Sequence, residues 1–167
     1  MPTLHLKVPL SDEAMAYLSE ILTEEKGETT ASHWLFANAL KPRIKETAET
    51  RKLVRARGSL DLPGGKKVTP ADFDIGPLES FPEGQVEFTL SERVVGWIEE
   101  SAGYITAVNQ RTGGTLLWTT PAEWVREICL AAIATRAAKL DGEELDDEEK
   151  ANYPPADKDG RPAPRKA

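Results

Sequence analysis

The feature that most constrains the fold of this chain is a short pattern that occurs twice, about eighty residues apart. Residues 3–8 alternate apolar and polar side chains, and residues 85–90 do the same. Such alternation is typical of a strand that buries one face. Each alternating run is followed by a serine, Ser11 or Ser91, and then by acidic residues, which favours a helix start directly after the strand. The sequence therefore predicts two strand-then-helix units.

Each unit is predicted to contain a second helix. In the first unit this helix follows Gly27, begins at a Thr29, Thr30 or Ser32 cap, and is expected to end or kink at Pro42. In the second unit, residues 120–123 read Thr-Pro-Ala-Glu, which is a capping box with proline in the first helical position. This signal predicts a helix that continues to about residue 140. Residues 104–118 leave two alternatives open, a small inserted hairpin or a helix that continues to residue 109.

These patterns divide the 167 residues into four segments. The predicted segments are a first strand-helix-helix repeat (1–47), a Pro/Gly-rich connector (48–84), a second repeat (85–140) and an acidic, Pro-rich tail (141–167). The tail has seven acidic residues within 141–150, and it is predicted to be disordered because it offers too little apolar surface to offset the entropy of ordering. We expect an α+β fold, mainly helical.

The formal net charge of −7 is unevenly distributed along the chain. Residues 140–167 carry −4 and residues 59–84 carry −3, whereas residues 1–58 and 85–139 together are neutral, and residues 41–58 carry a local charge of +5. Overall acidity argues against a generic binder of polyanions, because nucleic-acid affinity comes largely from Lys and Arg at phosphates. The neutral repeats mean that net charge neither excludes nor favours DNA.

Composition also excludes several kinds of chemistry. No apolar run reaches the length of a membrane helix, no signal-peptide pattern is present, and the single cysteine, Cys129, excludes an internal disulfide and a cysteine-based zinc cluster. We therefore expect a cytoplasmic protein that does not bind membranes. His5 and His33 are the only histidines, and no nucleophile, acid–base or metal-binding motif occurs. The sequence predicts no enzyme activity, no catalytic or metal-binding residues and no cofactor.

Two pairs of segments carry a resemblance to a known family. They read LHLKVPLSDEAMAYLSEI with GETTASHWLFANAL, and VEFTLSERVVGWIEES with TTPAEWVREICLAAI. In order and pattern the chain resembles a tandem form of the ribbon-helix-helix superfamily, to which the Arc and MetJ repressors belong. The resemblance implies that the two strands pair antiparallel as a ribbon over a helical core. In that family the ribbon enters the major groove of DNA, where its outward side chains contact base edges.

The resemblance also implies which residues would contact DNA. The outward strand positions would contact bases, and among them Glu87 would be unfavourable near phosphates unless it is paired. The caps of the second helices would hold phosphate with backbone amides, a role that falls to Thr119 and Thr120 in the second repeat. The base-contacting candidates are Thr3, His5, Lys7, Gln85 and Thr89, and the phosphate-contacting candidates, including the basic stretch, are Thr29, Thr30, Ser32, Lys41, Arg43, Arg55 and Arg57.

Two functional hypotheses follow from the sequence. The first is a sequence-specific DNA-binding regulator or accessory protein whose partner is double-stranded DNA. The second is a non-enzymatic protein–protein interaction module, such as a phage- or plasmid-type adaptor or inhibitor, that binds a basic protein through acidic and tryptophan-rich surfaces. Whether the chain forms a homo-oligomer stays open.

Overall fold

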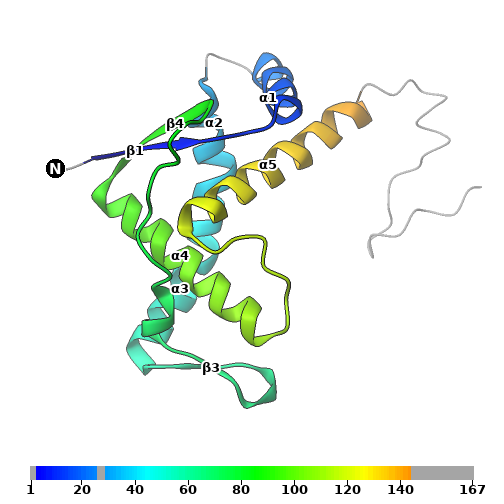
Figure 1. The fold of residues 1–167 in the computed structure, drawn as a ribbon. Coiled ribbons are helices and arrows are strands. Elements are labelled where there is room, and N and C mark those ends of the chain that lie inside the picture. Colours follow the sequence, from blue (N-terminus) through cyan, green and yellow to red (C-terminus); the bar gives the residue numbers. More distant parts are fainter. Residues whose placement is uncertain (1–2, 26–28, 144–167) are drawn as a thin grey trace, which may run out of the picture.

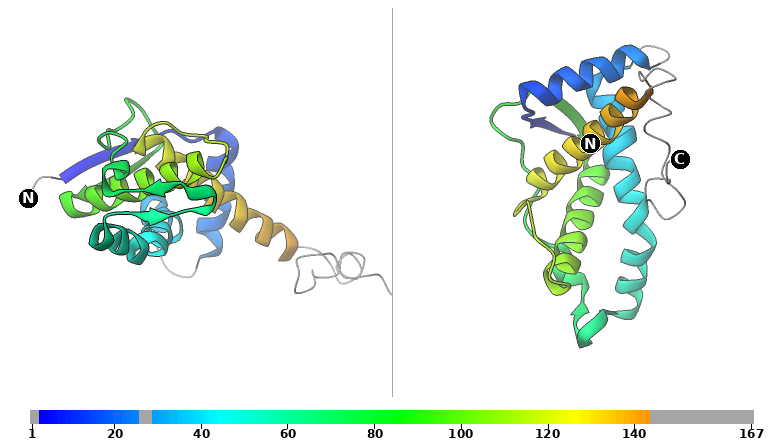
Figure 2. Two further views of the ribbon diagram at one scale, coloured as in Figure 1. Left: turned by 90° about the horizontal axis from the view of Figure 1, so that it is seen from below. Right: turned by 90° about the vertical axis from the view of Figure 1, so that its right-hand side faces the viewer.

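The computed structural model describes residues 3–25 and 29–143 and shows an α+β fold in which helices predominate (Figure 1). One two-stranded sheet lies against the helices, and a long helical arm extends from it toward a small hairpin (Figure 2). The predicted tail lies outside the described residues from position 144 onward, and 141–143 belong to the last helix. No helix within the described ranges has the length and apolar character needed to span a bilayer.

The two alternating segments form the strands β1 (Thr3–Val8) and β4 (Val86–Ser91), and these strands pair antiparallel, as predicted. Leu6 lies opposite Phe88 and Val8 lies opposite Val86, and all four side chains are buried. Because side chains alternate across a strand, the intervening polar residues face away from the core. Ser11 and Ser91 cap the following helices α1 (Asp12–Glu24) and α4 (Glu92–Arg111) through their hydroxyl groups.

Of the two outcomes predicted at Pro42, an end or a kink of the second helix, the end is wrong, because the chain stays helical through Pro42. Helix α2 (Ala31–Leu35) continues through a π-helical turn, η1 (Phe36–Leu40), into α3 (Lys41–Arg57). Proline clashes with the carbonyl four residues before it and lacks an N–H donor. The π turn relieves this problem, because the Lys41 N–H bonds the carbonyl of Phe36, five residues back.

Residues 48–57 belong to α3 and not to the connector, which corrects the predicted segment boundary. Helix α3 is held against the rest of the protein by a buried stripe that contains Thr47, Arg51 and Val54. The helix ends at Gly58, which has the left-handed φ of 86° that favours glycine. The connector then forms a hairpin and two short 3₁₀ turns: β2 (Leu60–Asp61), η2 (Pro63–Gly65), β3 (Lys67–Val68) and η3 (Pro70–Phe73).

Between Gly103 and Arg111 the chain is helical, because α4 continues through this stretch; the alternative of an inserted hairpin there is wrong. Gly103 does not end the helix. Its missing side chain lets η3 approach, since a Cβ on Gly103 would lie 2.0 Å from the carbonyl oxygen of Phe73. The predicted second helix of this unit is confirmed as α5 (Pro121–Glu143), and the Thr120 hydroxyl accepts a hydrogen bond from the Glu123 N–H.

The core has two parts. The main cluster lies beneath the β1–β4 pair and joins it to α1, α2, α4 and α5, with Trp124 among its fully buried side chains. A smaller cluster lies at the far end of α3 and α4, where Val54, Val68, Phe73 and Ala107 pack together. The molecule therefore has one end built around the strand pair and another built around the hairpin.

Candidate nucleic-acid interface

The exposed face of the β1–β4 pair carries a row of polar side chains. The strand register places His5 opposite Thr89 and Lys7 opposite Glu87. The side-chain oxygen of Thr89 lies 3.4 Å from Nδ1 of His5 across the pair. The apolar residues of the same strands are buried or half-buried on the other face, so the row is held on a fixed support. We call this set the polar row; its members are Thr3, His5, Lys7, Glu87, Thr89 and Ser91.

The polar row is electrically balanced. It contains one lysine and one carboxylate, Lys7 and Glu87, directly opposite each other in the register. Opposite charges on facing positions of an antiparallel pair attract each other. The unfavourable acidic residue noted in the sequence thus has a basic neighbour on the same face. The charges of the polar row therefore give this face no net attraction for a polyanion.

Gln85 does not belong to the polar row. It precedes β4, and its Oε1 accepts a hydrogen bond of 2.9 Å from the Leu10 N–H. This bond uses the amide oxygen to tie the start of β4 to the segment after β1. Gln85 was predicted to lie in the strand because its polarity fits the alternation. Its hydrogen bond to Leu10, 75 positions away, leaves no local pattern in the sequence.

The beginning of α2 lies beside β4. Helix α2 contacts β4, and residues of both line a cavity of about 460 Å³ that includes Thr30, Ser32, Thr89 and Ser91. Thr30 caps the helix by accepting a hydrogen bond of 3.2 Å from the His33 N–H, and its hydroxyl lies 3.4 Å from that of Ser32. Thr29, which donates to the Thr30 carbonyl at 3.5 Å, immediately precedes the cap. The structure thus brings the predicted caps next to the polar row.

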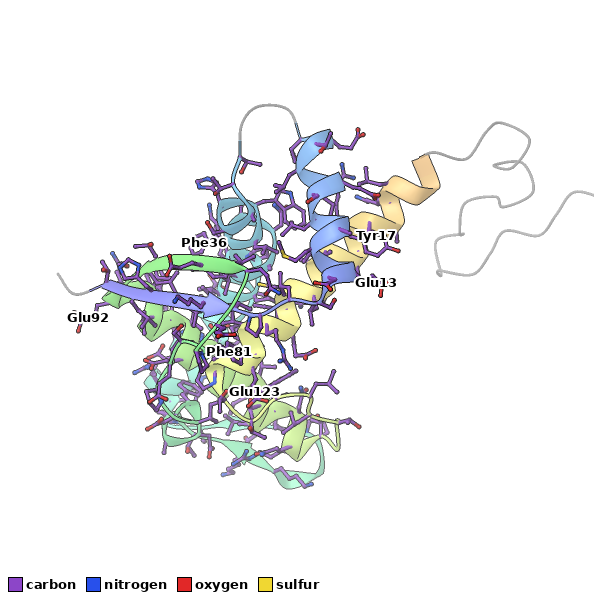
Figure 3. All side chains as sticks on the ribbon, turned by 45° about the horizontal axis from the view of Figure 1, so that its top comes forward. Glu13, Tyr17, Phe36, Phe81, Glu92 and Glu123 are labelled. Atoms are coloured by element: carbon purple, nitrogen blue, oxygen red, sulfur yellow. The ribbon has the colours of Figure 1, made fainter. Side chains whose placement is uncertain are left out.

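The beginning of α5 has different surroundings. Thr119 and Thr120 both donate to the Glu123 carboxylate, at 2.9 and 3.2 Å, instead of facing an open strand. Connector residues, including Ser80 and Phe81, line a cavity of about 350 Å³ together with Thr120 and Arg126. The guanidinium of Arg126 lies 5.8 Å from the centre of the Phe81 ring. In Figure 3 the labelled Phe81 and Glu123 lie on this side of the strand pair, and Phe36 lies beside β4.

The connector also covers the outer edge of β1. The Lys7 N–H donates to the Ser80 hydroxyl at 2.8 Å, and the Phe81 N–H donates to the Lys7 carbonyl at 3.2 Å. Gly84 then passes so close to Val8 that a Cβ on Gly84 would meet the Val8 backbone at 2.5–2.7 Å. We call residues 77–84 the strap. Sequence reasoning missed the strap, and its one local signal was a glycine immediately before the second alternating run.

The basic residues of α3 do not form one surface beside the polar row. Lys41 and Arg43 lie ten or more residues after the start of α2, which is roughly 15–20 Å along the helix at 1.5 Å per residue. Arg55 and Arg57 lie in the last turn of α3, about 40 Å from Thr30 by the same rise. The structure thus separates Arg55 and Arg57 from the strand pair.

Two of the arginines of α3 have structural partners at the far end. Arg51 is buried, donates to the Glu100 carboxylate at 2.8 Å and also bonds the Thr47 hydroxyl and the Ile44 carbonyl. Burial lowers the pKa of Arg51, and the charge of Arg55 lowers it further. Arg55 forms an ion pair with the same Glu100 carboxylate and lies over the Phe73 ring. Arg51 and Arg55 thus join α3 to α4 and η3.

The remaining candidate side chains offer little reactive chemistry. Cys129 is fully buried, and burial raises the pKa of its thiol to about 12, so the reactive thiolate is disfavoured. Within residues 3–25 and 29–143, no three His, Cys, Asp or Glu side chains are grouped closely enough to hold a metal ion. Of the four tryptophans only Trp97 is exposed, with the Arg93 guanidinium 4.8 Å from its ring centre. The described residues thus form no tryptophan-rich surface.

Comparison with protein-family models, with curated proteins and with solved structures found no match to this chain.

Proposed function

We propose that the chain is a sequence-specific DNA-binding regulator or accessory protein and that the β1–β4 pair is its DNA-contacting ribbon. The observation that carries this proposal is the antiparallel pairing of two strands about eighty residues apart, with one face buried and six polar residues on the other. A two-stranded ribbon fits into the major groove of B-DNA, where polar side chains can bond base edges. The fold would then be a single-chain ribbon-helix-helix arrangement.

The side chains of the polar row suit this role. Lys7 can donate to guanine, the hydroxyls of Thr3 and Thr89 can bond either kind of base edge, and His5 can donate or accept. Glu87 opposes phosphate but can accept from the amino group of cytosine. A row with one positive and one negative side chain favours contacts that depend on base identity over contacts that depend on charge alone.

The phosphate contacts of this proposal are asymmetric. On the β4 side, backbone amides at the start of the continuous helix 31–57 lie next to the polar row, where Thr30 and Ser32 line the cavity. Such amides and hydroxyls are suited to a phosphate group. On the β1 side the strap occupies the equivalent place. The proposed DNA complex therefore uses one helix start, and Arg55 and Arg57 take no part in it.

Duplex selection followed by titration tests this function. Duplexes are selected from a random library at low salt, and the affinity of the full chain for the best duplex is measured by fluorescence anisotropy. Lys7→Ala is expected to weaken binding about 5- to 150-fold, because a good contact to a base is worth ~1–3 kcal/mol. Glu87→Gln is expected to strengthen binding, because it removes a negative charge from the groove.

Lys67→Ala provides the matched control. Lys67 is an exposed lysine on the far hairpin, 3.8 Å from Asp61, so its removal changes the net charge by the same amount away from the polar row. It is expected to leave affinity for the selected duplex nearly unchanged. The proposal is wrong if no duplex binds at low salt, or if Lys67→Ala and Lys7→Ala weaken binding equally.

A further inference from the structure

A groove with a basic rim lies between α5 and the continuous α2–η1–α3 helix, away from the polar row. It has a volume of about 340 Å³. Its floor is apolar and includes Trp34, Ala39 and Ile128, and its rim carries Arg43, Arg136 and Lys139. Among the described residues that line the groove, the one acid is Glu46, which pairs with Arg43 at 3.2 Å. The described lining therefore has three basic side chains and one acidic side chain around an apolar floor.

We infer that this groove is the docking site of the acidic segment that follows α5 in the same chain, residues 144–153. The segment has five acidic residues between 144 and 149, and Leu145 and Tyr153 as its apolar and aromatic members. Acidic side chains match the rim, and a tyrosine ring matches a floor that includes tryptophan and isoleucine. The charge and the apolar content of the segment are thus both complementary to the groove.

The connection between segment and groove is short enough for this docking. Helix α5 ends at Glu143, one turn after Lys139 on the rim. The middle of the groove, near Ala132 and Thr135, lies about 12–17 Å back along the helix axis at 1.5 Å per residue. An extended chain covers that distance in about five residues at ~3.3 Å each. The acids from 144 to 149 can therefore pass the rim, and Tyr153 can reach the floor.

A second groove on the same helix provides an internal comparison. It lies between α1 and α5, has a volume of about 360 Å³, and is lined mainly by small and apolar side chains of α5 with Tyr17. Its one charged lining residue is acidic, Glu13. Both grooves are within reach of the segment after Glu143. Charge therefore selects the groove beside α3 over the groove beside α1.

Paramagnetic relaxation in the full chain tests the docking. Ala151→Cys is labelled with a nitroxide; Cys129 should not react, because it is buried and its pKa is raised to about 12. In ¹H–¹⁵N spectra at low salt we expect selective loss of cross-peak intensity at residues 38–46. These residues are remote from position 151 in sequence, so proximity along the chain does not explain the loss. Residues 11–17 beside the other groove should keep their intensity.

Two controls separate docking from non-specific proximity. Replacing the five acids between 144 and 149 by their amides, or adding ~0.5 M salt to screen charge, is expected to restore intensity at 38–46. Docking is overturned if intensity is lost equally beside both grooves, or only in the last turns of α5, or if the amide variant behaves like the parent. It is also overturned if the loss appears only when labelled and ¹⁵N-enriched chains are mixed, because the occupant is then a second copy.

Discussion

The outer edges of β1 and β4 both carry outward-pointing backbone N–H and carbonyl groups, but the two edges have different surroundings. The bonds from Ser80 and Phe81 show that the N–H and carbonyl of Lys7 point away from β4. Because Lys7 faces Glu87 in the register, the corresponding groups of Glu87 point away from β1. The strap covers the β1 edge, whereas the β4 edge faces the cavity beside the start of α2. Two similar sequence patterns thus produce one closed edge and one accessible edge.

The difference shows how a single chain can make a two-fold pattern asymmetric. The strap is the last part of the connector that joins the two patterns, so it can lie only along one edge. An unprotected strand edge can pair with other chains, and the strap removes that hazard at β1. At β4 the helix start lies beside the edge, and this is the side on which we place the phosphate contact.

Gly84→Ala is the strongest way to disturb the closed edge. A methyl group at this position would meet Val8 backbone atoms at 2.5–2.7 Å, so the strap or β1 must move. We expect a loss of about 1–3 kcal/mol in the free energy of unfolding, measured by denaturant titration. Gly96→Ala is the matched control, because nothing lies within 4 Å of its added Cβ and alanine favours the helix. An unchanged stability for Gly84→Ala would contradict the close approach of the strap.

Thr30→Val and Thr120→Val compare the two helix starts. Each variant removes a capping hydroxyl, and each is expected to lower the free energy of unfolding by about 1 kcal/mol. Only Thr30→Val is expected to weaken DNA binding, by about 3- to 10-fold, because only that hydroxyl lies beside the accessible edge. Anisotropy titration of both variants against one selected duplex checks this difference. Equal losses of affinity would mean that both helix starts contact DNA.

The smallest expected effect concerns Asp72, whose carboxylate holds the part of the connector near the hairpin against α4. Asp72 accepts hydrogen bonds from the Thr69 backbone and hydroxyl and pairs with Arg111 at 3.0 Å. The backbone bond from Thr69 is the main cause that holds the pKa of Asp72 below its ordinary value of 3.8. When folding lowers the pKa of a carboxyl group, the group stabilises the fold at pH values above its pKa in the unfolded chain. This stability is lost as the pH falls through the lower pKa of the folded state.

Urea titrations of the parent and of Asp72→Asn check this effect. At neutral pH the parent is expected to be modestly more stable than the variant, and the difference should disappear as the pH falls below 3.8. A difference that stays constant at pH values well below 3.8 would show that the carboxylate charge does not anchor the connector.

Local sequence patterns predicted where the strands and helices begin, but they did not predict which distant residues those elements contact. The alternation in 3–8 and 85–90 and the serine and threonine caps depend on neighbouring residues, and the strands and helix starts appear where these signals lie. Pro42 does not end its helix, as one of the two predicted outcomes required, because a π turn accommodates it. The burial of Arg51 depends on Glu100, which is 49 residues away, so the basic stretch looked like a free surface in the sequence.

The exposed strand residues of the candidate site were predictable from the sequence, whereas the segments held by distant contacts were not. The alternation identified Thr3, His5, Lys7 and Thr89 as exposed neighbours of one face, and the structure places them there. Gln85 and the strap were beyond local reasoning, because each is positioned by hydrogen bonds to residues more than 70 positions away.

The central claim, that the β1–β4 pair contacts DNA through its polar row and one helix start, is tested most directly by a ¹H–¹⁵N spectrum of the full chain titrated with a selected duplex. We predict that the largest shift changes occur in residues 3–7, 87–91 and 30–33. Residues 119–123 beside the strap and 62–67 on the far hairpin should change little. Largest changes in the far hairpin or in 119–123, or a spectrum that does not change at saturating duplex, would contradict the account.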